Sequence, residues 1–121
     1  MPKILVVDDE PGIINLLREF LRKKNYEVIT ASGGAEALQK VETDAPDLII
    51  LDVRMPGMSG LEVLKEIMRT KKDISVVMAT AVTDEEIGRA ALQMGAFDYV
   101  IKPFDLEQLE KILWWKCNLM S

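Results

Sequence analysis

The segment Ile4-Leu5-Val6-Val7-Asp8-Asp9-Glu10 joins a short apolar run to three consecutive acids. Three more apolar runs lead into a polar residue in the same way: 48–51 before Asp52, 76–79 before Thr80, and 99–101 before Lys102. Short apolar runs separated by helical patterns are typical of parallel strands that are buried on both faces. Because ligands bind at the carboxyl ends of the strands in an open parallel sheet, we expect these polar side chains to converge on one pocket.

The rest of the chain alternates between strand-like and helical patterns. The expected strands cover residues 3–8, 27–31, 48–52, 75–80 and 98–101. The expected helices begin near Pro11, after Gly33-Gly34, at Leu61, at a capping box formed by Thr83-Asp84-Glu85-Glu86, and after a cap at Asp105. Parallel strands require right-handed crossovers. We therefore predict one α/β domain over residues 1–121, a doubly wound five-stranded parallel (βα)5 sheet with the flavodoxin-like strand order 2-1-3-4-5.

Composition excludes several classes of function. The chain has no histidine and one cysteine, Cys117, which excludes Ser-His and Cys-His nucleophile pairs, multi-cysteine zinc sites and an internal disulfide. A net charge of −5 argues against direct contact with nucleic acid. No apolar stretch approaches the roughly 20 residues of a membrane span. We expect no membrane association and a reducing, cytoplasmic location.

The polar residues at the strand ends suit phosphoryl transfer. Carboxylates without nearby histidine or cysteine are ligands for a hard cation such as Mg²⁺. Asp52 could act as a nucleophile, while Lys102 and the Thr80 hydroxyl could bind phosphoryl oxygens. Each residue also has a plainer interpretation. The acids at 8–10 could form a solvated loop at a helix start, Lys102 could pair with Asp52, and Thr80 could satisfy the end of a strand.

Five short motifs, in this order, resemble the receiver domain of two-component response regulators, the CheY-like family. They are Val7-Asp8-Asp9-Glu10, the strand ending at Asp52, Met55-Pro56-Gly57-Met58-Ser59-Gly60, Thr80-Ala81, and Tyr99 followed by Lys102-Pro103-Phe104. Residues 52–58, and residues 95–99 together with 102–105, resemble those of NtrC-type regulators most closely. The resemblance covers essentially the whole chain.

The resemblance implies a role for each motif residue. Asp52 would be the phosphoacceptor, and Lys102 would contact the phosphoryl group. Mg²⁺ would be held by Asp9, Asp52 and the backbone carbonyl of Arg54, with Asp8 assisting through water. Thr80 and Tyr99 would form the switch pair. Arg54 and Val82 occupy the positions that tune the lifetime of the phosphoryl group.

The same resemblance implies a signalling domain that is not an enzyme, although it assists its own phosphorylation and dephosphorylation. The donor would be a phosphohistidine on a sensor histidine kinase or phosphotransfer protein. The surface of the fourth helix, fifth strand and fifth helix would meet an output domain, a partner protein or a second copy, with transcription as one output. Trp114 and Trp115 lie in the fifth helix, and we expect one of them to pack on the sheet.

Three alternatives have different signatures. A flavin-binding protein of this fold needs a Ser/Thr/Gly-rich phosphate loop after the first strand, where this chain has Asp8-Asp9-Glu10. An aspartate-nucleophile phosphatase would place its nucleophile after the first strand, with a second acid two residues on. A degenerate receiver that acts only as a protein-interaction module would lack part of the set that this chain retains.

Overall fold

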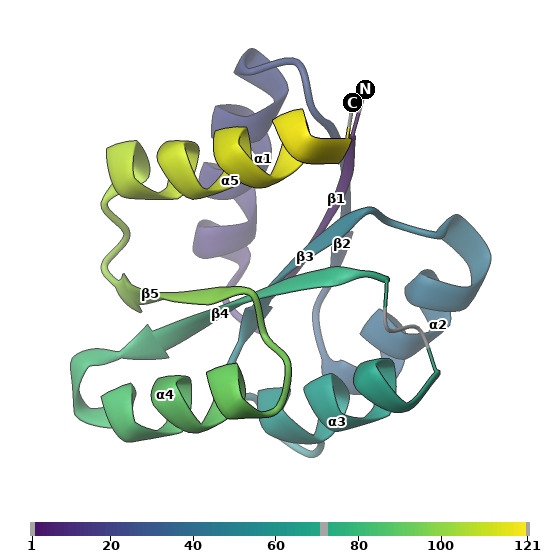
Figure 1. The fold of residues 1–121 in the computed structure, drawn as a ribbon, viewed down its shortest axis with the longest axis vertical. Coiled ribbons are helices and arrows are strands. Elements are labelled where there is room, and N and C mark those ends of the chain that lie inside the picture. The colour runs from purple at the N-terminus through teal and green to yellow at the C-terminus, as the bar shows by residue number, and fades with distance from the viewer. Residues whose placement is uncertain (1, 71–72, 121) are drawn as a thin grey trace.

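Five parallel strands alternate with five α-helices in the computed structural model, which describes residues 2–70 and 73–120 without the side chains of Val82 and of residues 117–120 (Figure 1). The strands are β1 (Lys3–Val7), β2 (Glu27–Ala31), β3 (Leu48–Asp52), β4 (Ser75–Ala81) and β5 (Asp98–Lys102). The helices are α1 (Pro11–Lys23), α2 (Gly34–Asp44), α3 (Gly60–Thr70), α4 (Glu85–Gln93) and α5 (Leu106–Met120), with a 3₁₀ turn η1 (Val82–Asp84) before α4. The strand order β2-β1-β3-β4-β5 confirms the predicted topology.

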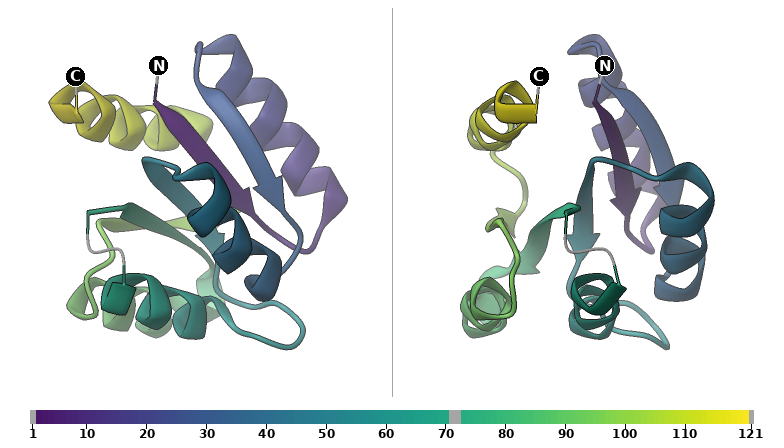
Figure 2. Two further views of the ribbon diagram at one scale, coloured as in Figure 1. Left: turned by 90° about the vertical axis from the view of Figure 1, so that its right-hand side faces the viewer. Right: turned by 45° about the vertical axis from the view of Figure 1, so that its right-hand side comes forward.

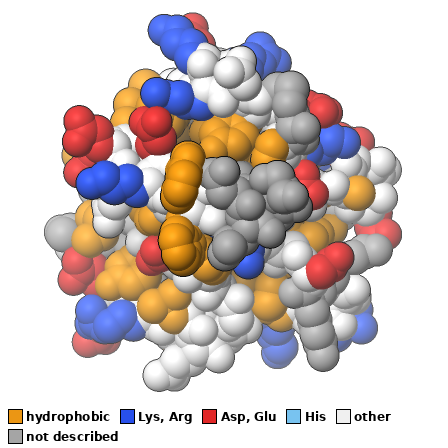
Figure 3. All heavy atoms as spheres, turned by 45° about the horizontal axis from the view of Figure 1, so that its top comes forward, with side chains coloured by type: hydrophobic (Ala, Val, Ile, Leu, Met, Phe, Trp, Pro, Cys, Tyr) orange, Lys and Arg blue, Asp and Glu red, His pale blue; other side chains and the backbone are white. Residues whose placement is uncertain are grey.

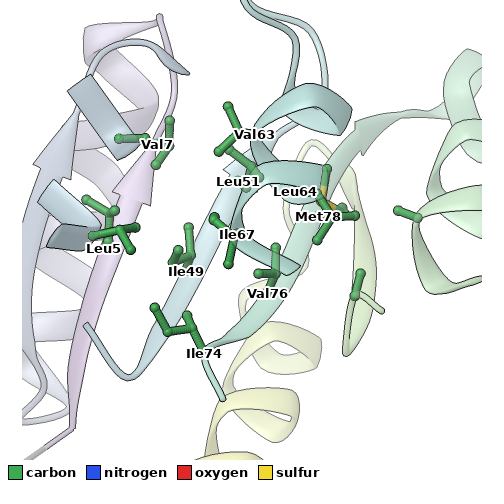
Figure 4. Close-up of a cluster of buried hydrophobic side chains, with 14 of the residues drawn as sticks. Leu5, Val7, Ile49, Leu51, Val63, Leu64, Ile67, Ile74, Val76 and Met78 are labelled. Atoms are coloured by element: carbon green, nitrogen blue, oxygen red, sulfur yellow. The ribbon is translucent and has the colours of Figure 1, made fainter. Parts of the chain in front are cut away.

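The sheet separates two hydrophobic cores, because successive side chains of a strand point to opposite faces. Leu5 and Ile49 belong to the core beneath α2, α3 and α4, whereas Ile4 and Ile50 belong to the core beneath α1 and α5. Figure 2 shows the helices on both sides of the sheet, and Figure 4 shows the first of these cores between β1, β3, β4 and α3. All five residues of β3 are buried, so the central strand reads as a continuous apolar run that ends in one acid, Asp52.

The helical spacing of apolar residues places the expected faces against the sheet. In α1, Leu17 and Leu21 are fully buried, and Ile13 and Phe20 pack on the same core. The last turn of α1 carries Arg22 and Lys23, where positive charge complements the helix dipole. In α5, the backbone N–H groups of residues 107 and 108 donate to the side chain of Asp105, which confirms the predicted cap.

The predicted capping box at the start of α4 is wrong. The chain enters α4 through the 3₁₀ turn, and the N-cap residue, Asp84, makes no side-chain hydrogen bond to the helix. Its carboxylate is instead bound by Arg54. A reciprocal capping pair occurs at α3, where Ser59 Oγ accepts from the N–H of Glu62 and Glu62 Oε1 accepts from the N–H of Ser59.

The prediction for the tryptophans is also wrong, because neither packs on the sheet. Trp114 and Trp115 are 58% and 57% exposed, and both line a surface groove along α5. Leu109 and Leu113 cover the sheet instead, since the helical repeat turns residues 114 and 115 away from that face. Figure 3 shows hydrophobic side chains at the surface on the side that includes α5. Within the described residues, no helix combines the length and the apolar character needed to cross a membrane.

Candidate functional site

Three charged side chains from three strand ends meet at the carboxyl edge of the sheet. Asp8 follows β1, Asp52 ends β3 and Lys102 ends β5. The ammonium nitrogen of Lys102 lies 2.7 Å from Asp8 Oδ2 and 3.2 Å from Asp52 Oδ1. Asp8 and Asp52 are 2% and 6% exposed, so two nearly buried carboxylates share one partly buried cation. The sequence predicted that Asp8, Asp52 and Lys102 would converge and that Lys102 would pair with Asp52, but not the shorter contact between Lys102 and Asp8. The Thr80 hydroxyl, expected in the same pocket, makes no hydrogen bond to these three residues.

The environment of Asp52 in this cluster disfavours its ionised form. Burial and the negative charge of Asp8 raise the pKa of Asp52 from 3.8 to about 6, although Lys102 acts in the opposite direction. Burial by itself would lower the pKa of Lys102, but its hydrogen bond with Asp8 and the charge of Asp52 raise it. One ammonium therefore does not compensate the negative charge of the pocket, and a second cation there would stabilise the ionised form of Asp52.

A candidate cation site adjoins the cluster. Asp8, Asp9 and Glu10 each offer a carboxylate oxygen within 4.8 Å of the others. Asp8 is fixed by the N–H of Glu10, which donates to Asp8 Oδ1 at 2.9 Å, whereas Asp9 and Glu10 are exposed to solvent. Hard oxygen ligands at an open edge fit a cation such as Mg²⁺, which keeps part of its water shell.

Thr80 and Tyr99 lie on neighbouring strands, beneath α4. Thr80 is fully buried at the end of β4, and among the described residues its hydroxyl has no hydrogen-bond partner. Tyr99 is half-buried and packs against the core beneath α4. The two side chains approach Gly88 of α4: a Cβ there would lie 2.8 Å from the Tyr99 ring and 3.3 Å from the Thr80 methyl group. The absence of a side chain at residue 88 lets α4 sit against both.

Arg54, two residues after Asp52, binds Asp84 at the start of α4 and not the charged cluster of Asp8, Asp52 and Lys102. Its Nε and Nη2 donate to the two carboxylate oxygens of Asp84 at 2.6 and 2.7 Å. The hydrogen bond with Arg54 lowers the pKa of Asp84 and raises that of Arg54 itself. The sequence indicated that Arg54 could fold over a phosphoryl group but did not indicate Asp84 as its partner. The side chain of Val82, the second residue at the tuning positions, lies outside the described part of the chain.

Gly60 fixes the loop that follows Asp52. A Cβ at this position would lie 2.2 Å from the backbone oxygen of Asp52, so no other residue fits without moving the strand end. The N–H of Gly60 donates to the carbonyl of Val53 at 2.8 Å. The start of α3 and the end of β3 are thereby held together.

The sequence relationships agree with this geometry. Residues 4–113 match the response regulator receiver domain family. The chain belongs to this family. It is 50% identical over 103 residues to the alkaline phosphatase synthesis transcriptional regulatory protein PhoP of Bacillus subtilis, a match that covers 84% of this chain and 42% of PhoP. It is 37% identical over 107 residues to sporulation initiation phosphotransferase F of the same organism, covering 88% of this chain and 86% of that protein.

A solved receiver structure gives the same picture. The response regulator protein TrrA from Thermotoga maritima, in complex with Mg²⁺ and BeF, is 44% identical, with a TM-score of 0.83 over 92% of this chain and 95% of that one. The predicted family and fold are thus confirmed. This receiver domain spans less than half of PhoP but most of the phosphotransferase, so its relatives include both long and short proteins. The narrower likeness to NtrC-type regulators stays a prediction.

Proposed function

We propose that this receiver domain accepts a phosphoryl group on Asp52 from a phosphohistidine of a sensor kinase or phosphotransfer protein. A carboxylate oxygen of Asp52 would attack phosphorus, the phosphorus–nitrogen bond of the donor would break, and the imidazole would leave and take up a proton. The observation that carries the proposal is the nearly buried Asp52 carboxylate, whose pKa is raised to about 6 and which lies 3.2 Å from Lys102. At neutral pH this group is ionised, as a nucleophile must be.

The neighbouring residues have separate parts in this step. Lys102 is positioned between Asp8 and Asp52, so its ammonium can move with little displacement onto a phosphoryl oxygen. Asp9 and Asp52, with the backbone carbonyl of Arg54 and with Asp8 through water, would hold Mg²⁺. The bound cation supplies positive charge that offsets the charge of the transferring oxygens. The presence of Mg²⁺ and BeF in the TrrA complex supports a site of this type.

The conformational response would run through Thr80 and Tyr99. The buried hydroxyl of Thr80 lacks a partner among the described residues, and a phosphoryl oxygen on Asp52 would provide one. Movement of Thr80 toward Asp52 frees space into which Tyr99 turns. This shifts the population toward a second arrangement of the surface formed by α4, β5 and α5. An output domain, a partner protein or a second copy would bind that surface, with transcription as one output.

The kinase would approach from α1, which starts beside the acidic residues. Asn15 and Arg22 of this helix are exposed, and Arg18 is half-buried. We place the domain in the cytoplasm, where such kinases present their phosphohistidine, and assign it no direct contact with nucleic acid.

Intact-mass measurement after treatment with a small phosphodonor tests the proposal. The parent should gain one phosphoryl group in the presence of Mg²⁺, and chelation of the cation should remove most of the gain. Asp52→Asn should gain none, whereas the matched variant Asp47→Asn, at the opposite edge of the sheet, should be labelled like the parent. Full labelling of Asp52→Asn would refute the assignment. A parent that is never labelled would instead support the alternative of a degenerate receiver that acts only as an interaction module.

A further inference from the structure

The link between Arg54 and Asp84 joins the loop after the acceptor strand to the start of α4. Both hydrogen bonds of the Arg54 guanidinium go to this one carboxylate, in the two-pronged geometry that is the strongest arrangement for arginine and a carboxylate. The Arg54 side chain is 72% exposed, whereas that of Asp84 is 7% exposed. The arginine is therefore the partner that can move, and its departure would leave the nearly buried Asp84 carboxylate in need of another donor.

Asp84 has a second set of donors within its own backbone neighbourhood. It is the N-cap residue of α4, a position at which an aspartate side chain usually accepts from the backbone N–H two or three residues later. Those N–H groups belong to Glu86 and Ile87. In this structure the cap hydrogen bond is absent from α4, and the carboxylate that would make it is bound to Arg54.

We propose that Asp84 is a positioning residue that exchanges partners when Asp52 is phosphorylated. Without the phosphoryl group, Asp84 holds Arg54 and leaves the start of α4 uncapped. With it, Arg54 moves to the phosphoryl oxygens and Asp84 caps α4. The inference rests on the proposed function of Asp52 and adds a second connection to α4, separate from Thr80 and Tyr99.

The energetics favour an exchange over a simple loss of the pair. A phosphoryl group carries more negative charge than one carboxylate and offers several strong acceptor oxygens, so it competes effectively for a guanidinium two residues away in the chain. Asp84 then gains N–H donors and the positive end of the helix dipole in place of Arg54. Arg54 and Ile87 also line a common surface groove, which gives the arginine side chain open space beside α4.

A double-mutant cycle measures how Asp84 and the phosphoryl group compete for Arg54, with Mg²⁺ and beryllofluoride as the probe of the phosphorylated state. Asp84→Asn releases Arg54 and should tighten beryllofluoride binding about threefold, a modest gain because the Arg54 side of the competing ion pair is exposed to solvent. In an Arg54→Met background the same substitution should leave the affinity unchanged. Glu85→Gln is the matched control, because it removes a neighbouring acid that pairs with Arg89 instead of Arg54, and it should bind like the parent.

Amide hydrogen exchange at Glu86 and Ile87 reports the cap itself. The parent should become protected at these two amides only when the probe is bound, Arg54→Met should be protected without it, and Asp84→Ala should be protected in neither state.

An equal effect of Asp84→Asn in both backgrounds, or no effect in either, would overturn the exchange while leaving phosphorylation of Asp52 intact. Failure of the parent to bind the probe at all would overturn the proposed function and this inference together.

Discussion

Replacing Asp52 with asparagine should stabilise the protein at neutral pH and leave its stability nearly unchanged in acid. The reason is the environment of the carboxylate, which is 6% exposed, adjoins Asp8 and has a pKa raised from 3.8 to about 6. A raised pKa means that the folded protein holds this proton more tightly than the unfolded chain does. Asp52 therefore destabilises the fold once it ionises, and asparagine removes that charge with little change of shape.

The magnitude follows from the separation of the two pKa values. Below pH 3.8 the carboxyl is neutral in both states and the variant should match the parent. Between pH 3.8 and about 6 the unfolded chain releases the proton while the folded protein keeps it, so the parent loses stability with rising pH. Above pH 6 the difference levels off at about 3 kcal/mol, because each pH unit of separation corresponds to about 1.4 kcal/mol. This equals roughly 10 °C in melting temperature for a domain of this size.

Urea denaturation of the parent and the variant at several pH values between 4 and 8, in the presence of a chelator, measures this difference. Asp44→Asn, at the end of α2 and away from the pocket, controls for removal of one negative charge from a chain of net charge −5. Mg²⁺ added at pH 7.5 should stabilise the parent more than Asp52→Asn. A difference between variant and parent that is the same at pH 4.5 and pH 8 would refute the reasoning, as would a variant that is the less stable of the two at pH 8.

The remaining predictions concern the response to phosphorylation and the partners. Thr80→Val should raise stability by about 1 kcal/mol, because it removes a buried hydroxyl without a partner among the described residues, and should still accept phosphate but lose the phosphorylation-dependent shifts of α4 and β5 in NMR spectra. Unchanged shifts would contradict the role given to Thr80. The double variant Arg54→Asn, Val82→Glu should lose phosphate faster than the parent, because it removes the guanidinium expected to cover the phosphoryl oxygens and adds a carboxylate able to orient water. Equal rates of phosphate loss would argue against the role of Arg54 and Val82 in the lifetime of the phosphoryl group. A histidine kinase domain should perturb the amides of α1, and spectra in which α1 is untouched would count against that docking surface.

Backbone pattern and chain order were sufficient to predict the sheet and the residues that meet at its edge. Apolar runs that end in Asp52 and Lys102 have few structural explanations, and parallel topology forces their ends to the same edge. The strand boundaries differ by one residue at most, as at β4, which ends at Ala81 instead of Thr80. The roles of these residues in phosphoryl transfer rest on the family resemblance and the proposal above.

Side-chain partners across the fold were not predictable in the same way. The motif Thr83-Asp84-Glu85-Glu86 indicates a capping box with Thr83 as the N-cap, but the 3₁₀ turn shifts the helix start by one residue and makes Asp84 the N-cap. The carboxylate of Asp84 then binds Arg54, 30 residues earlier. A motif of four residues does not indicate which side chain from a distant part of the chain will bind one of its carboxylates. The exposure of Trp114 and Trp115 was missed for a different reason. The helical spacing of Leu109 and Leu113 sets the face that meets the sheet, and it turns residues 114 and 115 away from that face.

The close approach of Gly60 to the backbone of Asp52 has a practical consequence for following this protein in motion. On one side of Asp52, the start of α3 is held against β3 by the close backbone approach of Gly60 and by its hydrogen bond to Val53, so α3 cannot shift along the strand. On the other side, α4 is joined to the same loop by a side-chain pair that can exchange. If Asp84 exchanges partners as proposed, α3 would serve as the fixed reference and α4 as the element that moves. A spectroscopic label at Lys65 of α3 and another at Arg89 of α4, both exposed positions, would form a reference–reporter pair whose separation follows signalling.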